Sequence, residues 1–561
     1  MQAADTPPLA APTARRRERP SPLLLAAGTV AVVLLLPIAT VCLHVFLPDK
    51  GTWRHLVDTV LASYVVNTLL LAVGTGIGVV AIGVPAAWMV SMCRFPGRRL
   101  LEWALVLPLA VPAYVLAYAY TDFLQTAGPV QTAIRDLTGW TVQDYWFPEI
   151  RSLPGAIGMF VMVLYPYVYL LARAAFLEQS VGVLETSRML GCTPWSAFFR
   201  VAVPLARPAI VAGMALALME TLADFGTVAY FGVPTFTTGI YRTWFSFGDP
   251  TAAAQLSTVL LGFAVMLIAA ERWSRGQARY HQTRGRFKAL PGYRLTGLRA
   301  VLAILACVVP LFFGFLLPGV VLLRMAFVDG DAQFGARYFS LVGNSFILSG
   351  VTAVIAVMVS VLLAYAMRLK PGAFSAAVGR LAGMGYAVPG SVIAIGVLIP
   401  FGLFDNALDA WMRKTFGIST GLLLTGGIAG LVFAYLVRYL AVALQTVDAS
   451  LAKITPNMDA AARTLGAGPG RTLLRIHAPI MGPSLITAGL IVFVDVMKEL
   501  PATLLLRPFN FDTLAVQAFN LAADERLAEA STASLGIVAV ALLPIVVMSR
   551  AIARSRAKDI A

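Results

Sequence analysis

Long apolar runs recur along the whole chain, separated by short polar and basic segments. Each run has about 20 residues, the length that an α-helix needs to cross the hydrocarbon core of a bilayer. The short alternating segments typical of a membrane β-barrel do not occur in the sequence. The pattern predicts an all-α integral membrane protein with about twelve transmembrane helices. The expected spans are 23–47, 64–91, 100–124, 155–177, 207–231, 252–272, 299–325, 343–368, 380–404, 420–446, 483–505 and 529–549.

Composition and charge agree with a membrane protein. Of the 561 residues, 59% are hydrophobic and 13% are charged, whereas a soluble protein is roughly 45–50% apolar and 25% charged. The net charge of +15 could indicate a nucleic-acid partner. We expect none, because the basic residues lie in short loops such as 93–99, 272–288 and 549–558. By the positive-inside rule these loops are cytoplasmic, and an even number of spans places both termini there.

The two halves of the chain repeat each other at a shift of about 275 residues. The repeat aligns Asn67 with Asn344 and Pro112 with Pro389. A six-span shift keeps the orientation in the membrane, so the axis relating the halves should follow the membrane normal, with a pathway between them. The expected organisation is a disordered basic tail at 1–21, a first transmembrane domain at 22–272, an Arg-rich linker at 273–298, a second homologous transmembrane domain at 299–550 and a tail at 551–561.

The sharpest repeat lies between spans four and five of each half. The copies are ETSRMLGCTPWSAFFRVAVPLARPAI (185–210) and AAARTLGAGPGRTLLRIHAPIMGPSL (460–485). Each reads as a short helix, a break at Gly and a second amphipathic helix, which Pro204 or Pro479 should end. On the predicted cytoplasmic side, such an element suits docking onto a soluble partner; the alternative is a helix resting on lipid headgroups. We expect His477, within the second copy, at the surface.

The repeated loop resembles the EAA loop of binding-protein-dependent ABC importer permeases. The second copy has Ala460 where the family has Glu, and Asp459, one residue earlier, would take that role. The resemblance implies that each loop is a coupling helix seated in an ATPase subunit. The residues so implicated are Glu185, Arg188, Gly191, Pro204, Asp459, Arg463, Gly466 and Pro479.

The stretches 220–249 and 496–527 are similar to the fused two-domain permeases of ferric-iron importers. This resemblance covers nearly the whole chain. It implies a permease of the bacterial inner membrane that works by alternating access. It also implies a periplasmic iron-binding protein, for which loops 231–251 and 506–528 would be the contact surfaces. The alternatives are an ABC permease for thiamine, polyamine, sulfate or phosphonate, and a proton-coupled secondary transporter.

The chain itself lacks the means to hydrolyse ATP. It contains no Gly-Lys dipeptide and therefore no Walker A loop. The Gly-rich stretch GTGIG (74–78) lies within a span, where small residues allow close helix packing. We therefore expect no enzyme activity and no cofactor in this chain. Separate ATPase subunits would use ATP and Mg²⁺, and two docking loops predict two copies of them.

Acidic pairs occur inside the fifth span of each half. Glu220 and Asp224 are four residues apart on one helical face, and the repeat aligns them with Asp495 and Glu499. A carboxylate at the centre of a bilayer costs about 3 kcal/mol, so four of them at matching depths indicate a function.

Three interpretations of the four acids remain open. They could line a passage between the halves for a hard cation, binding Fe³⁺ transiently without a resident metal site. They could pair with Lys498, Arg438 or other groups and fix helix orientation. They could also lie closer to the periplasm, partly solvated. Because Gly226 and Pro501 follow the acids, we expect the helix to loosen just beyond them in either half.

Overall fold

The computed structural model describes residues 22–178, 189, 191, 193–275, 293–328 and 334–558. Among these residues, eleven helices are long and apolar enough to cross a bilayer, and a bent helix pair adds a twelfth candidate. The predicted all-α membrane fold is therefore confirmed. The spans are Pro22–His44, Leu61–Met92, the pair Arg98–Ala110 and Ala113–Thr138, Leu153–Leu177, Trp195–Ala223, Pro250–Ser274, Leu298–Phe327, Ala336–Leu369, Gly390–Phe416, Ile428–Leu451, Pro469–Met497 and Leu527–Pro544.

The third predicted span, 100–124, is broken by a bend of 91°. Helix α5 (Arg98–Ala104) and the 3₁₀ turn η1 (Leu107–Ala110) precede the bend, and α6 (Ala113–Leu124) follows it. Pro112 lies in the bend with an extended backbone, ψ 145°. Proline also disfavours helical geometry in the residue before it, so the chain turns here.

The second repeat breaks at the matching proline. Pro389 has ψ 143° and separates the 3₁₀ turn η4 (Met384–Ala387) from α19 (Gly390–Phe416). The predicted span 380–404 therefore starts too early, because its first residues belong to α18 (Ala373–Ala382) and η4.

Equivalent hydrogen bonds support the internal repeat. Asn67 Nδ2 donates to the Pro234 carbonyl at 2.9 Å, and Asn344 Nδ2 donates to the Asp512 carbonyl at 3.0 Å. Both asparagines lie near the start of the long second helix of their repeat. Each ties that helix to the loop that follows the broken fifth span.

The first helices of each repeat pack against the other repeat. Helices α1 (Pro22–Leu34) and α2 (Leu36–His44) lie against α17 (Ala336–Leu369), α18 and α19. In return, α15 (Leu298–Leu311) and α16 (Leu317–Phe327) lie against α5 and α6 of the first repeat. The two halves are therefore interlocked.

Close helix packing occurs at the Gly-rich stretch of α4 (Leu61–Met92), as predicted. A Cβ added at Gly78 would lie 2.3 Å from Val161 Cγ2 on α8 (Leu153–Glu178). The same holds at Gly74, where an added Cβ would lie 2.7 Å from Ile157 Cδ1. Only glycine lets these two helices approach so closely.

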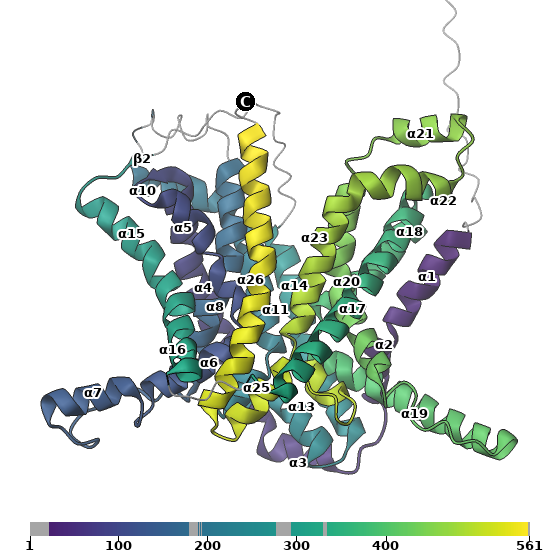
Figure 1. Ribbon diagram of the computed structural model, residues 1–561, viewed down its shortest axis with the longest axis horizontal. Coiled ribbons are helices and arrows are strands. Elements are labelled where there is room, and N and C mark those ends of the chain that lie inside the picture. Colours follow the sequence, from purple (N-terminus) through teal and green to yellow (C-terminus); the bar gives the residue numbers. More distant parts are fainter. Residues whose placement is uncertain are drawn as a thin grey trace, which may run out of the picture.

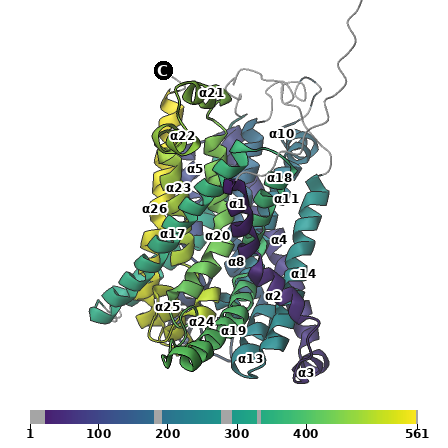
Figure 2. The same cartoon turned by 90° about the vertical axis from the view of Figure 1, so that its right-hand side faces the viewer.

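Both copies of the repeated loop lie at one end of the molecule. Figures 1 and 2 show α10 (Pro194–Ala197), α21 (Pro456–Thr464) and α22 (Pro469–Thr472) at this end, with α13 (Phe236–Phe245) and α25 (Leu514–Ala523) at the opposite end. We call these the coupling end and the far end. Other elements are α3 (Thr52–Thr59), α7 (Pro129–Thr138), α14 (Pro250–Arg275), the π-helical turn η3 (Phe312–Leu316), α20 (Ile428–Leu451), α26 (Leu527–Lys558) and a parallel bridge between β1 (Cys93–Arg94) and β2 (Tyr293–Arg294). The elements of the fifth spans are described with the site below.

Candidate functional site

The fifth span of each repeat breaks at its second carboxylate. In the first repeat, α11 (Val203–Ala223) ends before Asp224 and the short α12 (Gly226–Tyr230) follows. In the second, α23 (Ala478–Met497) ends before Glu499 and α24 (Pro501–Leu506) follows. The predicted loosening beyond the acids is confirmed.

Asp224 caps the short helix that follows it. Its carboxylate accepts hydrogen bonds from Thr227 N at 2.9 Å, Thr227 Oγ1 at 3.1 Å and Val228 N at 3.3 Å. Among the described residues, no Lys or Arg nitrogen lies within 4.0 Å of it. The acid is therefore held by helix-end N–H groups, which stabilise negative charge.

Glu499 caps α24 in the same way but also meets a cation. It accepts from Ala502 N at 2.8 Å, Thr503 N at 3.0 Å and Thr503 Oγ1 at 2.7 Å. Arg438 Nη1 on α20 lies 3.2 Å from Glu499 Oε1, and Arg438 Nη2 lies 3.7 Å from Glu220 Oε2. Arg438 thereby connects a carboxylate of the first repeat with one of the second.

Asp495 pairs with a lysine of its own repeat. Lys498 Nζ lies 3.0 Å from Asp495 Oδ1, and the Lys498 carbonyl accepts a hydrogen bond from Tyr114 of the first repeat at 3.3 Å. Although Lys498 is next to Glu499 in the sequence, its side chain pairs with Asp495, which lies three positions earlier, about one helical turn away. The ion pairs anticipated with Lys498 and Arg438 are thus present.

All four acids line one cavity of about 100 Å³ between the repeats. The first repeat contributes α6, α8 and α11, and the second contributes α20, α23 and the start of α24. Four carboxylates face two cations here. The side chain of Glu499 is 1% exposed, whereas those of Asp495 and Glu220 are 22% and 34% exposed. Aromatic side chains complete the wall, namely Tyr114, Phe160, Tyr167 and Tyr439.

The four carboxylates do not converge on one point in this state. Across the described part of the chain, no group of three or more His, Cys, Asp or Glu side chains is placed to hold a metal ion. Arg438 stands between Glu220 and Glu499, and Asp224 is turned toward the N-terminus of α12. The site is a cavity lined by four carboxylates together with the two cationic side chains Arg438 and Lys498.

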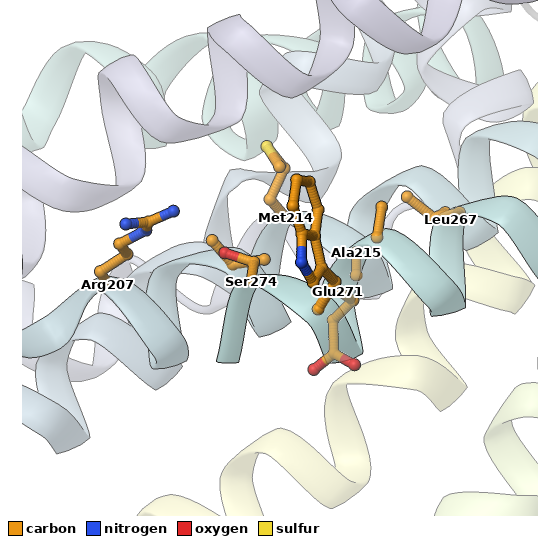
Figure 3. A pocket seen from close by; sticks show the side chains of 9 residues that line it. Arg207, Met214, Ala215, Leu267, Glu271 and Ser274 are labelled. Atoms are coloured by element: carbon orange, nitrogen blue, oxygen red, sulfur yellow. The ribbon is translucent and has the colours of Figure 1, made fainter. Parts of the chain in front are cut away.

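A larger hollow of about 340 Å³ lies between α11 and α14. Figure 3 shows Arg207 and Leu267 at opposite ends of this hollow and the carboxylate of Glu271 directed away from Met214. None of the predicted pathway acids lines it, and both of its walls belong to the first repeat. It is therefore a weaker candidate for a passage between the repeats than the smaller carboxylate cavity.

We call the two copies of the repeated loop, 185–210 and 460–485, the first and second coupling loops. The second is organised around Asp459, the residue that directly precedes it. Arg368 on α17 contacts its carboxylate through Nε at 3.0 Å and Nη2 at 2.8 Å. His477 Nε2 lies 2.7 Å from the other carboxylate oxygen, and the His477 side chain is fully buried beside Tyr365. The surface position expected for His477 is therefore wrong. Its proximity to Asp459 comes from the fold of the loop, since the two residues are 18 positions apart in sequence.

The two coupling loops turn at equivalent glycines. Gly191 has φ +79° and Gly466 has φ +76°, a left-handed conformation that other residues adopt at a cost. Arg463 is exposed beside this turn. Glu185 and Arg188 lie outside the described residues. The predicted glycine break is thus present in both copies.

The prolines after the coupling loops do not end a helix, which corrects the prediction for Pro204 and Pro479. The chain is helical from Trp195 to Ala223 and from Pro469 to Met497. A π-helical turn precedes each proline, at Phe198–Ala202 and Leu473–His477. Such a turn widens the helix where proline cannot donate its hydrogen bond, so the span continues. The second element of each loop is therefore continuous with the fifth span.

Another ion pair joins the repeats at the far end. Arg151, just before α8, donates to both carboxylate oxygens of Glu525 at 2.7 Å and to Tyr230 Oη at 3.0 Å. This bidentate contact lowers the pKa of Glu525. Glu525 belongs to the predicted contact loop 506–528 and has φ +61°. Sequence reasoning missed this pair because its partners are 374 residues apart.

Comparison with known proteins shows which transport proteins this chain is similar to. Residues 79–271 match the family of binding-protein-dependent transport system inner membrane components. The Fe(3+)-transport system permease protein FbpB 2 of Haemophilus influenzae is 27% identical over 542 residues, which is 93% of this chain and 97% of that protein.

Shorter relatives match about a third of the chain. The molybdenum transport system permease protein ModB of Escherichia coli is 27% identical over 34% of this chain and 83% of its own length. The sulfate transport system permease protein CysW of Escherichia coli is 28% identical over 36% of this chain and 66% of its own length. These matches favour a binding-protein-dependent transport permease over the proton-coupled secondary transporter.

Proposed function

We propose that this chain is an ABC importer permease of the binding-protein-dependent type and that it carries ferric iron across the bacterial inner membrane. Residues 79–271 match that family, and similarity to an Fe(3+)-transport permease covers 93% of the chain. The observation that carries the proposal is the cavity between the repeats, which four carboxylates line at the break of the fifth spans. Ferric iron is a hard cation that prefers oxygen ligands. Similarity to an iron-transport permease extends over both repeats, whereas the molybdenum and sulfate permeases match about a third of the chain.

The acids Glu220, Asp224, Asp495 and Glu499 are proposed to form the passage. A passage must attract its ion and also release it. The caps on Asp224 and Glu499 and the cations beside the other acids moderate the negative charge.

The coupling end is proposed to dock two ATPase subunits, which use ATP and Mg²⁺. Apolar side chains are exposed beside the two glycine turns: Met189 is 88% and Leu465 is 85% exposed. Such side chains on short helices suit a groove on a soluble protein. With the coupling end in the cytoplasm, both termini lie there too. The far end, with loops 231–251 and 506–528, then meets a periplasmic iron-binding protein.

A second candidate cargo is an oxyanion. Relatives that transport molybdenum and sulfate match this chain, and two cationic side chains, Arg438 and Lys498, line the cavity. Both cations are already engaged by carboxylates at 3.0 to 3.7 Å. An oxyanion would have to displace those carboxylates, whereas a cation would add to them. The charge balance therefore favours a cation.

The experiment is a comparison of cargoes in one transport system. The full chain is produced with its ATPase and binding protein in cells lacking their own iron importer. Uptake of radioactive ferric iron, molybdate, sulfate, thiamine and a polyamine is then measured. We expect iron uptake alone to depend on the chain. Chain-dependent uptake of any other cargo, with no iron uptake, would overturn the proposal.

A further inference from the structure

Arg438 holds the central place among the charged groups of the cavity. It lies on α20 of the second repeat, and its side chain is 8% exposed. It contacts Glu499 of its own repeat at 3.2 Å and Glu220 of the other repeat at 3.7 Å. The guanidinium also lies over the Tyr439 ring, 5.4 Å from its centre. Among the described Lys and Arg side chains that line this cavity, Arg438 alone has carboxylates of both repeats within 4.0 Å.

The two ion pairs of Arg438 differ in length and in how deeply the carboxylate is buried. Glu499 is almost completely buried, caps α24 and makes the shorter contact. Glu220 makes the longer contact and keeps a third of its side chain accessible. Glu499 therefore anchors Arg438, and Glu220 is the carboxylate that can exchange this partner for another cation.

The first residue of α19 fixes the place of this pair. A Cβ added at Gly390 would lie 2.5 Å from Arg438 Nη1 and 2.7 Å from Glu499 Oε1. The absence of a side chain at Gly390 gives the ion pair its room. The pair thus sits against the N-terminus of α19, immediately after the break at Pro389.

Buried carboxylates need a counter-charge whenever the cavity holds no cargo. Removing one partner of a buried ion pair is costly because the other charge remains uncompensated. Lys498 supplies this counter-charge to Asp495, and N–H donors of α12 stabilise the charge of Asp224. For Glu220, the counter-charge that the structure supplies comes from the opposite repeat.

We propose that Arg438 is the resident counter-cation of the passage and exchanges with the cargo at Glu220. In the empty state it neutralises Glu220 and holds the two repeats together. When a trivalent cation enters, Glu220 turns to the cargo and Arg438 retains Glu499. On release, Arg438 returns to Glu220 and displaces the ion. Arg438 is thus a positioning residue that weakens cargo binding and closes the passage, and this inference rests on the proposed function.

Binding of trivalent terbium to the purified full chain tests the exchange. Terbium is a hard trivalent ion, and tyrosines such as Tyr114 and Tyr167 in the cavity wall can sensitise its luminescence. Arg438→Gln should raise the terbium affinity at least about tenfold, because one charge at ion-pair distance alters the affinity of a carboxylate for a cation by that order. Arg438→Lys, which keeps the charge, should remain close to the native affinity.

Arg173→Gln is the matched control. It breaks an ion pair of comparable burial with Glu102 inside the first repeat, away from the cavity. This variant should bind terbium as the native chain does. A purely structural role for Arg438 would leave the affinity unchanged or lower it in Arg438→Gln, and that result would overturn the proposal.

ATP hydrolysis separates this inference from the identity of the cargo. In the complex with the ATPase, without binding protein, Arg438→Gln should hydrolyse ATP several-fold faster than native, because the ion pair between Arg438 and Glu220 no longer holds the cavity closed. If Arg438→Gln hydrolyses ATP faster than native but neither the native chain nor any variant binds terbium, the role of Arg438 between the repeats is retained and iron as the cargo is overturned. Native hydrolysis together with native terbium affinity in Arg438→Gln would overturn the role of Arg438.

Discussion

Replacement of Glu499 should destabilise the chain far more than replacement of Asp224, although the two residues are equivalent in the repeat. Both carboxylates cap a short helix through three hydrogen bonds. Only Glu499 also neutralises a buried arginine, Arg438. The two alanine variants therefore share the loss of a cap and differ in the loss of an ion pair.

The magnitudes follow from these contacts. Loss of a cap costs about 1 kcal/mol. Breaking a buried ion pair costs roughly 3–5 kcal/mol. We expect a total of about 4–6 kcal/mol for Glu499→Ala and about 1–2 kcal/mol for Asp224→Ala. With an unfolding entropy near 2.1 cal/mol/K per residue, 1 kcal/mol shifts the Tm of a chain this long by about 1 °C.

Thermal unfolding can be followed with a thiol-reactive dye, because Cys93 and Cys307 are buried in the folded chain. Cys42 is exposed and would be replaced by Ser, together with Cys192, which lies outside the described residues. Glu499→Gln keeps an acceptor oxygen for the cap and loses the charge, so its Tm should fall between native and Glu499→Ala. Equal Tm shifts for Glu499→Ala and Asp224→Ala would refute the role assigned to the ion pair.

Three further predictions concern the turns and the far end. Gly466→Ala should reduce transport more than Gly466→Asn, because φ +76° is left-handed and Asn tolerates that region better; equal uptake would contradict this. Gly385→Ala should abolish folded protein on size exclusion, because its Cβ would lie 1.7 Å from the Val437 carbonyl oxygen. Glu525→Gln should lower the free energy of unfolding at pH 7 by less than about 1 kcal/mol, because the ion pair is exposed, and Tm should fall slightly with it. The contact with Arg151 lowers the pKa of Glu525. The stabilisation of the folded state by this ion pair is therefore complete above the ordinary pKa of 4.5 and is lost as the pH falls below that value and through the lowered pKa. A Tm difference between native and Glu525→Gln that persists at acidic pH would contradict this role of the ion pair.

The internal repeat could be predicted because both copies have glycine or proline at positions where the local backbone geometry favours these residues. Glycine at 191 and 466 takes a left-handed turn in both copies. Proline at 112 and 389 marks the same break in both halves. These features depend on a residue and its immediate neighbours, so a linear pattern records them. The matched acids of the fifth spans were found in the same way.

Contacts between distant segments were not predictable from such patterns. The position of Arg438 between Glu220 and Glu499 depends on how α20 packs against both broken spans. The burial of His477 depends on its contact with Asp459 across the loop. The π-helical turns before Pro204 and Pro479 depend on a span that continues beyond them. Each of these features is decided by tertiary packing, which outweighs the local preference.

The central claim is that the carboxylates between the repeats carry the cargo. Its most direct test is ferric iron uptake by the double variant Glu220→Gln/Asp495→Asn, with copurification of the ATPase as the check on assembly. These two substitutions neutralise one cavity acid of each repeat and leave both helix caps intact. We predict that iron uptake is lost while the ATPase still copurifies. Native uptake by this variant would contradict the account.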